Sequence, residues 1–308
     1  MKGKNNRFFR EGSTHHLYLK ALDGNVLFYR TEDYIFYLTL LFVLAERYGI
    51  SIEALSIMFN HTHTFTGPSG KAVFDAFRRD LQSMFSLGYN EEYHRTGPLM
   101  MPSGFAPKSS WKSIISCLCY IVNNPVAGRL CSSALEYKWN LLSYLVSDHP
   151  FSDRLIKRNC GFRMRKALRI VDDCFRKRKV LTYALQRQIF SKLSGREKRQ
   201  AIDYIVSKYN PLDKDAFISR FGSFEKAIVA IDATTGAEHD LAEPWEDYSI
   251  YVDMLKTTRS SGLDHHGFRF HEMDDVDLLK LTRKFSGIRN MTAEHLRRFL
   301  HVTRRRLE

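Results

Sequence analysis

Two histidines, His61 and His63, stand one residue apart in the segment SIMFNHTHTFTG, which otherwise has the composition of a β-strand. Residues i and i+2 of a strand point to the same face of its sheet, so the two imidazoles would lie side by side. Neutral imidazoles are frequent ligands of divalent cations. The spacing therefore predicts that the pair shares one metal ion, with a purely structural pair as the alternative.

A tyrosine and an asparagine four residues apart, Tyr120 and Asn124, form a second pair of chemical groups in the segment WKSIISCLCYIVNN. On a helical wheel at about 100° per residue, the apolar side chains of this segment form one stripe. The stripe comprises Trp111, Ile114, Ile115, Leu118 and Val122. Tyr120 lies roughly opposite the stripe and Asn124 follows one turn later, so both are predicted on the exposed side of the helix.

These two pairs together fit phosphodiester chemistry. Imidazoles from His61 and His63 and an amide oxygen from Asn124 leave open positions on Mg²⁺ or Mn²⁺, which would polarise a phosphodiester. A free tyrosine phenol has a pKa of about 10, so attack by Tyr120 needs such an activated phosphate. Because a phosphotyrosine bond conserves the energy of the cleaved linkage, a 3′-hydroxyl can rejoin the strand without a nucleotide cofactor.

Other histidines and tyrosines are weaker candidates for the same chemistry. His15 and His16 are expected at a solvent-facing strand end, and the late cluster HHGFRFH, residues 265–271, has no ligand spacing and is interpreted as a loop. Tyr93 is the rival nucleophile. Two glutamates precede it directly, and their charge would repel a phosphate, so Tyr120 is preferred.

The elements that must position these groups follow the order strand, helix, strand, strand, helix, strand, with a third helix after them. Predicted strands cover residues 15–22, 50–59, 61–65 and 99–101, and predicted helices cover residues 31–49, 71–89 and 111–124. This is the split βαβ order of a ferredoxin-like antiparallel sheet, so the sequence predicts an α+β fold.

The composition is that of an ordinary globular protein of 308 residues, for which length alone predicts two domains. No apolar stretch is long enough to cross a bilayer and no signal peptide is evident, so we expect a cytoplasmic protein without membrane contact. The five cysteines lack CxxC spacing and are expected to be reduced thiols.

The formal net charge of +13 indicates a polyanionic partner. Residues 1–150 contribute 15 Lys and Arg against 12 Asp and Glu, and residues 151–308 contribute 32 against 22. The electrostatic contacts with that partner are therefore expected mainly in residues 151–308.

The region 151–308 is predicted to be a basic, mainly α-helical extension. The acidic segment 230–249 reads as a loop or linker. Residues 274–303 have the pattern of two helices around a Ser-Gly turn, which fits a helix-turn-helix with Arg297 and Arg298 available to a DNA groove. A plain helical hairpin that packs on the rest of the chain fits the same pattern equally well.

Four segments, MFNHTHTF, HRTGPL, YIVNNPVAGRL and EYKWNLLSY, resemble the HUH single-tyrosine transposases of insertion sequences, including the REP-associated tyrosine transposases. The resemblance covers roughly residues 15–145 and implies an HUH nuclease domain over residues 1–150. It implies His61 and His63 as metal ligands, Asn124 as a further ligand and Tyr120 as the nucleophile. The implied substrate is single-stranded DNA with a hairpin, cleaved to a 5′-phosphotyrosine and a free 3′-hydroxyl.

The sequence departs from the family's pattern at three places. Phe59 replaces a proline, and Thr62 replaces the hydrophobic residue between the histidines. MMPSGFAPK stands where relatives place a Gly-Arg-aromatic group that handles DNA, so Lys108 is predicted to take part of that work. Arg78 and Arg79 are predicted as further DNA contacts. Relatives include dimers and monomers, which leaves a homodimer open.

Two other functions compete with a transposase. The first is a domesticated DNA-binding protein or regulator that keeps the fold and has little cleavage activity, and the altered segment after Leu99 favours it. The second is an RNA-binding ferredoxin-like module, which would place exposed aromatic residues on its central strands for base stacking. The histidine pair occupies that place instead, which disfavours the RNA-binding module.

Overall fold

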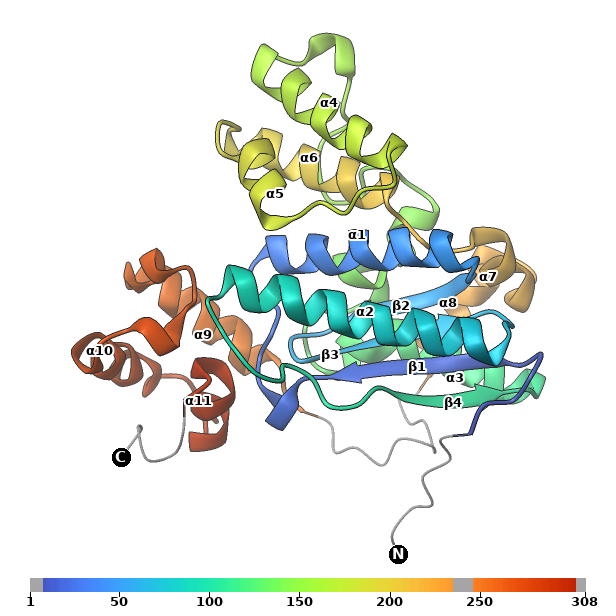
Figure 1. Cartoon of the computed structure of the whole chain (residues 1–308), viewed down its shortest axis with the longest axis horizontal. Helices are drawn as coiled ribbons and strands as arrows, with labels where there is room; N and C mark the ends of the chain where they lie inside the picture. Colours follow the sequence, from blue (N-terminus) through green and yellow to red (C-terminus); the bar gives the residue numbers. More distant parts are fainter. Residues whose placement is uncertain (1–7, 235–245, 303–308) are drawn as a thin grey trace, which may run out of the picture.

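The structure, a computed structural model, describes residues 8–234 and 246–302 (Figure 1). Most of the predicted acidic linker, residues 235–245, lies outside the described residues. In the described part, no helix is long and apolar enough to span a bilayer. The fold that these residues form is α+β.

A four-stranded antiparallel sheet forms the centre of the first half of the chain. Its elements are β1 (Thr14–Lys20), α1 (Thr31–Tyr48), β2 (Ile52–Ile57), β3 (His61–Thr66), α2 (Lys71–Glu92), β4 (Gly104–Lys108) and α3 (Trp111–Ala127). The strand order is β2-β3-β1-β4, and each neighbouring pair is antiparallel. The predicted ferredoxin-like, α+β architecture is confirmed.

The position predicted for the fourth strand, residues 99–101, is wrong. Met100 forms only an isolated bridge with Ala21, and regular pairing begins at Gly104. Pro102 has no N–H to donate to a ladder, so the strand starts beyond it. Gly104 also allows close approach of β1, because a Cβ at this position would lie 1.9 Å from the ring of Tyr18.

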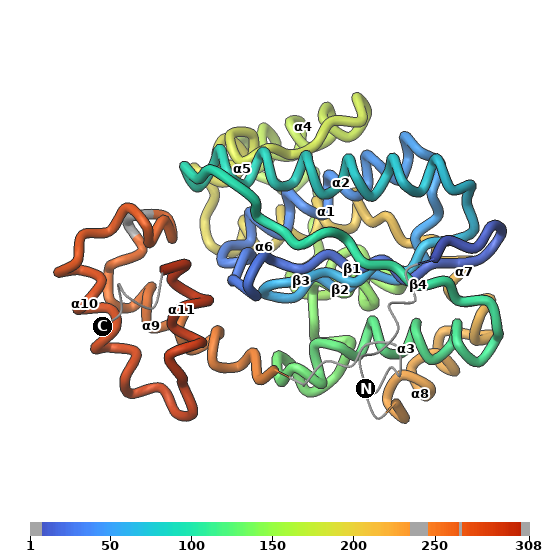
Figure 2. Tube along the Cα trace, turned by 60° about the horizontal axis from the view of Figure 1, so that its bottom comes forward, coloured from blue at the N-terminus to red at the C-terminus, as the bar shows by residue number. Residues whose placement is uncertain are grey.

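The two faces of the sheet are covered by different helices. Figure 2 shows α1 and α2 on one side of the sheet and α3 on the other. Leu17 and Leu19 of β1 face α1 and α2, whereas His16, Tyr18 and Lys20 alternate with them and face α3. The strands therefore supply an apolar core on one face and polar side chains on the other.

Helix α1 is apolar on almost its whole circumference because other elements surround it. The carboxylate of Asp33 accepts backbone N–H bonds from Tyr29 (2.9 Å) and Arg30 (2.8 Å) at its first turn, and Gly49 ends it with φ of 61°. One side of the helix packs on the sheet and α2. Its other side, with Phe42 and Val43, belongs to the core of the helices that follow residue 160.

The second half of the chain is helical, as predicted, and packs on three sides of the α/β unit. Its α-helices are α4 (Phe162–Arg176), α5 (Tyr183–Phe190), α6 (Gly195–Lys208), α7 (Lys214–Phe221), α8 (Phe224–Asp232), α9 (Ser249–Ser260), α10 (Asp275–Phe285) and α11 (Ala293–Leu300). Short 3₁₀ turns are η1 (Leu22–Gly24), η2 (Ala134–Glu136), η3 (Lys138–Asn140), η4 (Leu142–Leu145), η5 (Lys157–Asn159), η6 (Leu263–His266) and η7 (Phe270–Glu272). Helices α4, α5 and α6 lie over α1, α8 packs on α3, and α9, α10 and α11 form a separate group at one end (Figure 1).

The last two helices, α10 and α11, cover most of the segment 274–303 for which a helix-turn-helix or a plain hairpin was predicted, and α11 packs on the rest of the chain. Phe299 and Leu300 of α11 are buried in the same core as Tyr29, whose hydroxyl donates to the carbonyl of Phe299. The side chain of Thr292 caps α11 by accepting from the N–H of His295 (3.3 Å). The inner face of α11 is thus used for packing.

Candidate active site

The histidine pair lies on β3, on the face of the sheet that α3 covers. The ring centroids of His61 and His63 are 4.8 Å apart, and both side chains are buried. In the register with β1, Lys20 lies opposite His61 and Tyr18 lies opposite His63. The predicted side-by-side arrangement on one face is therefore present, next to a cation.

A third histidine, His16, joins this pair, and its predicted place at a solvent-facing strand end is wrong. His16 is buried because α3 covers this end of β1, and its Nε2 lies 2.9 Å from Nδ1 of His63. His15 points to the opposite face of the sheet, where its ring stacks on Phe9 at 4.5 Å. The alternation of β1 thus sends only one of the two adjacent histidines to the site.

The hydrogen bonds of Asn60 determine the tautomer of His61. The amide nitrogen of Asn60 faces two acceptors, the carbonyl of Gly24 (3.1 Å) and the carboxylate of Glu246 (3.4 Å). Its oxygen Oδ1 therefore faces Nδ1 of His61 at 2.7 Å, and Tyr248 donates to the same oxygen (3.2 Å). Because Oδ1 can only accept, Nδ1 of His61 carries the proton and Nε2 keeps the lone pair.

The two imidazoles meet at the amide of Asn124. Asn124 Nδ2 lies 3.4 Å from Nε2 of His63, and a hydrogen bond to the same side chain acts on the pKa of His61. Asn124 is almost fully buried between α3 and the sheet. Two ring nitrogens and one carboxamide therefore converge in a small, water-poor space.

Both imidazoles of the pair are neutral at physiological pH. The pKa of His61 is lowered to about 3, chiefly by burial, with the charges of Lys20 and His16 acting in the same direction and the hydrogen bond with Asn124 opposing them. Burial also lowers the pKa of His63 well below its ordinary value, with the charges of His61, His16 and Lys20 acting in the same direction. Neutral imidazoles keep the lone pairs that a cation needs.

Tyr120 faces the sheet, so the predicted exposure of Tyr120 and Asn124 is wrong. The ring centroid of Tyr120 lies 5.4 Å from that of His63 and 6.1 Å from that of His16, and only 7% of the residue is exposed. The helix is covered on both sides, because its apolar stripe, with Leu118, shares a core with residues of α8. Trp111, assigned to the buried stripe, is 61% exposed at the start of the helix.

A pocket of about 820 Å³ lies beside His61, between the sheet and the group α9 to α11. Its lining includes Lys20, Asn60, Met101, Tyr248, His295 and Arg298. The hydroxyl of Tyr248 also lies 3.4 Å from Nδ1 of His61. Residues from the C-terminal region thus contribute directly to the surroundings of the histidine pair.

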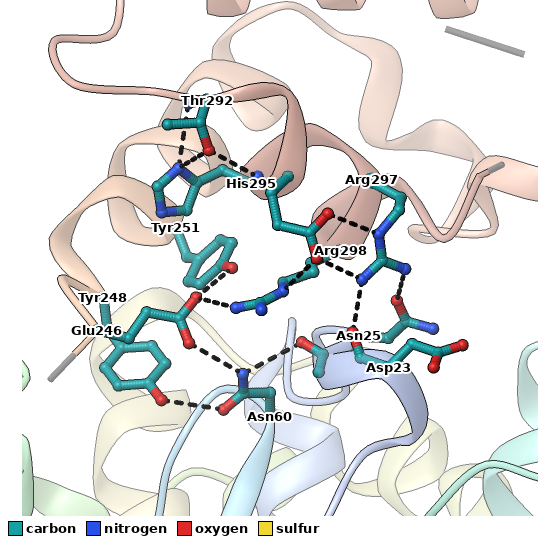
Figure 3. Close-up of polar contacts among 12 residues, drawn as sticks. Asp23, Asn25, Asn60, Glu246, Tyr248, Tyr251, Thr292, His295, Arg297 and Arg298 are labelled. Atoms are coloured by element: carbon teal, nitrogen blue, oxygen red, sulfur yellow. Dashed lines mark hydrogen bonds and ion pairs between the residues drawn. The ribbon is translucent and has the colours of Figure 1, made fainter. Parts of the chain in front are cut away.

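The arginines predicted to contact DNA from α11 are engaged within the protein (Figure 3). Arg297 pairs with Glu294 at 2.7 Å and donates to the carbonyl of Asp23 (2.6 Å). Arg298 pairs with Glu294 at 2.9 Å and with Glu246 at 2.8 Å. Arg297 therefore ties α11 to the first half of the chain, and Arg298 ties α11 to the segment just before α9.

Of the other predicted DNA contacts, only Lys108 is on the face of the sheet that carries Tyr120. Arg78 and Arg79 are on α2, across the sheet, and pair with Asp75 (2.8 Å) and Asp80 (3.3 Å). Lys108 ends β4 on the α3 face and is almost fully buried. Tyr93, the rival nucleophile, is buried across the sheet, where its hydroxyl donates to the carboxylate of Asp33 at 2.9 Å.

Thr62, which separates the two histidines, serves the opposite face of the sheet. Its hydroxyl lies 2.8 Å from that of Tyr37 on α1, and both groups are buried. A hydrophobic residue there would leave the Tyr37 hydroxyl with one partner fewer in the core. The departure at this position therefore has a structural explanation that does not involve the site.

Four residues of the site were missed by sequence reasoning: His16, Lys20, Asn60 and Tyr248. The alternation of β1 and its pairing with β3 would have found the first two, because His16 and Lys20 share a strand face. Asn60 directly precedes the pair, between the two predicted strands 50–59 and 61–65, and its type and position gave no reason to assign it to the site. No sequence pattern predicts the contact of Tyr248 with His61, because the two residues are 187 positions apart.

The donor set fits a divalent cation of the Mg²⁺ or Mn²⁺ class. Two neutral imidazoles and the Asn124 carboxamide offer nitrogen and oxygen donors of the right chemistry, with other positions left for water or phosphate. Within residues 8–234 and 246–302, no three or more His, Cys, Asp or Glu side chains are grouped as a metal site. The third donor of this set is therefore an amide rather than a carboxylate or an imidazole.

Comparison with known proteins gives one structural similarity. No protein-family model and no curated protein matches the sequence. The chain is similar to a solved REP-associated tyrosine transposase bound to a REP hairpin, with 15% sequence identity and a TM-score of 0.40. The similarity covers 51% of this chain and 93% of that one.

Proposed function

We propose that this protein is a metal-dependent transposase that cleaves and rejoins single-stranded DNA through Tyr120. The observation that carries the proposal is the placement of Tyr120 and Asn124 on one side of α3, directly across from the neutral pair His61 and His63. A phenol, an amide and two imidazoles in one buried space match the needs of phosphodiester transfer. The four motif segments that resemble HUH single-tyrosine transposases add support.

In the proposed first step, the Oη of Tyr120 attacks a backbone phosphorus. The Oη–P bond forms, the bond between phosphorus and the 3′ oxygen breaks, and the 3′ oxygen leaves as a hydroxyl after taking a proton from solvent. The phenol proton passes to solvent. In the reverse direction, a 3′-hydroxyl attacks the 5′-phosphotyrosine, restores a phosphodiester and frees Tyr120, so no nucleotide cofactor is consumed.

The residues around Tyr120 have separate tasks in this proposal. His61, His63 and Asn124 would hold Mg²⁺ or Mn²⁺, which supplies Lewis-acid polarisation of the attacked phosphate. His16 and Asn60 fix the ring orientations of the two histidines through their Nδ1 atoms. Lys20 adds a positive charge at the pocket, where a DNA phosphate would approach.

A DNA-binding protein with little cleavage activity is the second candidate function. The burial of Tyr120 favours it, because only 7% of the residue is exposed and a DNA strand needs access to the phenol. The contacts of Tyr248 and Glu246 with Asn60 narrow the space beside His61 further. The two candidates differ in one observable, a covalent bond between protein and DNA.

The test is a denaturing gel that detects a covalent protein–DNA adduct. Purified full-length protein is incubated with hairpin-bearing single-stranded oligonucleotides from the DNA that flanks its gene, labelled on either side of the hairpin, with Mg²⁺, Mn²⁺ or a chelator. We expect a metal-dependent adduct that retains the label on the 3′ side of the cut. Tyr120→Phe should abolish it, and Tyr18→Phe, a matched change on the same face of the sheet, should not.

Two results would count against the transposase. An adduct that persists in Tyr120→Phe assigns the nucleophile to another residue. Tight hairpin binding without an adduct under any metal supports the DNA-binding protein instead.

A further inference from the structure

The net charge of the molecule is concentrated in one helical segment. Residues 154–209, which include α4, α5 and α6 and are called the basic module below, contain 17 of the 47 Lys and Arg residues and 4 of the 34 Asp and Glu residues. The remainder of the chain has 30 of each and is formally neutral. The basic module alone therefore accounts for the whole net charge of +13.

Much of this charge is exposed and is not used in ion pairs. The solvent-facing cations of the module that pair with no acidic side chain among the described residues include Arg163, Lys166, Arg169, Lys192, Lys198 and Arg199. The apolar side of α4 instead contributes Met164, Leu168 and Val171 to the core. Helix α4 thus buries one side and presents a cationic side to solvent.

The basic module is fixed rigidly on α1. The Tyr183 hydroxyl donates to Asp33 (3.1 Å), the Gln186 amide donates to the carbonyl of Glu32 (3.0 Å), and the N–H of Leu181 donates to the Thr39 hydroxyl (3.1 Å). Phe42 and Val43 of α1 belong to the same core as α4 and α6. The cationic surface therefore has a set position relative to the sheet.

That position is across the sheet from the candidate active site. Figures 1 and 2 show α4, α5 and α6 beyond α1, whereas α3 lies under the other face. The cationic surface and Tyr120 are separated by α1 and the sheet. The cations of the basic module therefore do not line the candidate active site. A ligand that they bind would contact the protein at a separate surface.

We infer that the basic module binds duplex DNA through its phosphates. Exposed Arg163, Lys166 and Arg169 follow one another at intervals of about 4.5 Å along α4, which suits the dense phosphates of a duplex. Single strands are usually held on aromatic platforms. Phe162 is the sole aromatic residue of the described module that is more than a third exposed, so backbone contact to a duplex is favoured.

The inference deepens the proposed function, on which it depends for the identity of the nucleic acid as DNA. Cleavage of a single strand occurs on one side of the sheet, and double-stranded DNA that adjoins the cleaved strand is held on the other. The contact to phosphates carries no base sequence information, so the module contributes affinity rather than site choice.

The experiment measures the affinity of the full-length Tyr120→Phe protein, which cannot form the adduct, for a short blunt DNA duplex of arbitrary sequence over a range of salt concentrations. The test variant adds Lys166→Gln, Arg169→Gln and Arg199→Gln. The matched control adds Arg283→Gln, Lys284→Gln and Arg289→Gln, three exposed cations of the α10 region outside the module. Both variants lose the same net charge.

We expect the test variant to weaken duplex binding at least about 10-fold near physiological salt. The slope of log K against log salt should fall by about 0.9 for each phosphate contact removed, about 2.7 in all. The control should change affinity less than about 2-fold. Equal losses of duplex affinity in the test and control variants would overturn the inference, because the loss would then be a net-charge effect. An equal loss of affinity for a single strand of the same length would overturn the preference for a duplex.

A second assay, covalent adduct formation, distinguishes failure of the duplex-binding inference from failure of the proposed transposase function. The three module substitutions in a protein with Tyr120 intact should still give the covalent adduct on a short single-stranded oligonucleotide. Loss of duplex binding with the adduct retained supports the inference. Retained duplex binding overturns it, whether or not the adduct forms.

Discussion

The two faces of the central sheet carry side chains of opposite character, although the same strands supply both. On the α1 and α2 face, Leu17 and Leu19 pack in the main apolar core. On the α3 face, the same strand contributes His16, Tyr18 and Lys20, which stand beside the histidine pair. The α1 and α2 face can therefore stabilise the fold, while residues on the α3 face can be substituted and alter the chemistry of the site.

The difference between the faces also explains how buried polar groups are tolerated on the α3 face. Nδ1 of His61 bonds to Asn60 and Nδ1 of His63 bonds to His16, so neither nitrogen is left without a partner. Nε2 of His63 lies 3.4 Å from the amide nitrogen of Asn124, and Asn124 also forms a hydrogen bond with His61. Substitution of the polar side chains on the α3 face is therefore expected to leave the protein folded. Substitution of the apolar side chains on the α1 face is expected to destabilise it.

The largest effect is expected from His63→Leu. A leucine fills the space but removes a donor nitrogen, so adduct formation should fall by about 1,000-fold, the loss of about 4 kcal/mol of transition-state stabilisation. The free energy of unfolding should fall by no more than about 2 kcal/mol, because the leucine adds apolar burial while His16 and Asn124 each lose a buried partner. A gel time course and urea titrations measure the two effects. Activity within about tenfold of the wild type would contradict the assignment.

The reverse behaviour is expected on the other face. Leu17→Ala creates a cavity in the main core and should lower the free energy of unfolding by about 3 kcal/mol. The rate of adduct formation by the folded fraction should not change. Leu279→Ala, at a position 56% exposed on α10, is the control and should stay within about 0.5 kcal/mol. A matching loss of activity per folded molecule in Leu17→Ala would break the division between the faces.

The α3 face should also make stability depend on pH. Burial lowers the pKa of His61 from 6.5 to about 3, so the unfolded chain binds a proton that the folded state rejects. The stability is fully present above pH 6.5 and is lost as the pH falls, by about 2 kcal/mol for this histidine at about pH 5. Urea titrations in chelator should show this loss, and His61→Gln should reduce it. An unchanged pH dependence in the variant would show that His61 titrates normally.

The smallest effect is expected from the residue that orients His61. Asn60→Ala removes the acceptor for Nδ1–H, so the ring and its tautomer are less well fixed. The dissociation constant for Mn²⁺ should rise about 10-fold, measured by calorimetry, with the fold retained. Asn25→Ala, near the same pocket but without a bond to a histidine, serves as the control. Equal Mn²⁺ affinity in Asn60→Ala and the wild type would remove Asn60 from the site.

Local patterns predicted the chemical groups, and tertiary contacts decided their surroundings. The spacing of His61 and His63 and the order of strands and helices were enough to predict the ferredoxin-like sheet and the neighbouring imidazoles. The wheel of the third helix gave the wrong exposure for Tyr120, because periodicity separates two sides of a helix but does not show that both are covered. The cover on the apolar side is α8, more than a hundred residues later.

Contacts between segments far apart in the sequence could not be predicted either, because a local pattern does not show which distant segments pack together. Arg298 reads as a free cation in the sequence, but Glu246 reaches it across the interface between α11 and the start of α9. The excess charge was visible in the second half of the chain. Its confinement to the basic module became clear only when the fold showed where α4, α5 and α6 begin and end.

The measurement that tests the central claim most directly is peptide mapping of the protein–DNA adduct by mass spectrometry. The adduct formed with Mn²⁺ is digested with nuclease and protease, and the peptide that carries a nucleotide is sequenced. We predict a single modified residue, Tyr120, joined to a 5′-phosphate. A nucleotide on Tyr93, on Tyr248 or on any other residue would contradict the assignment of the α3 face as the catalytic face.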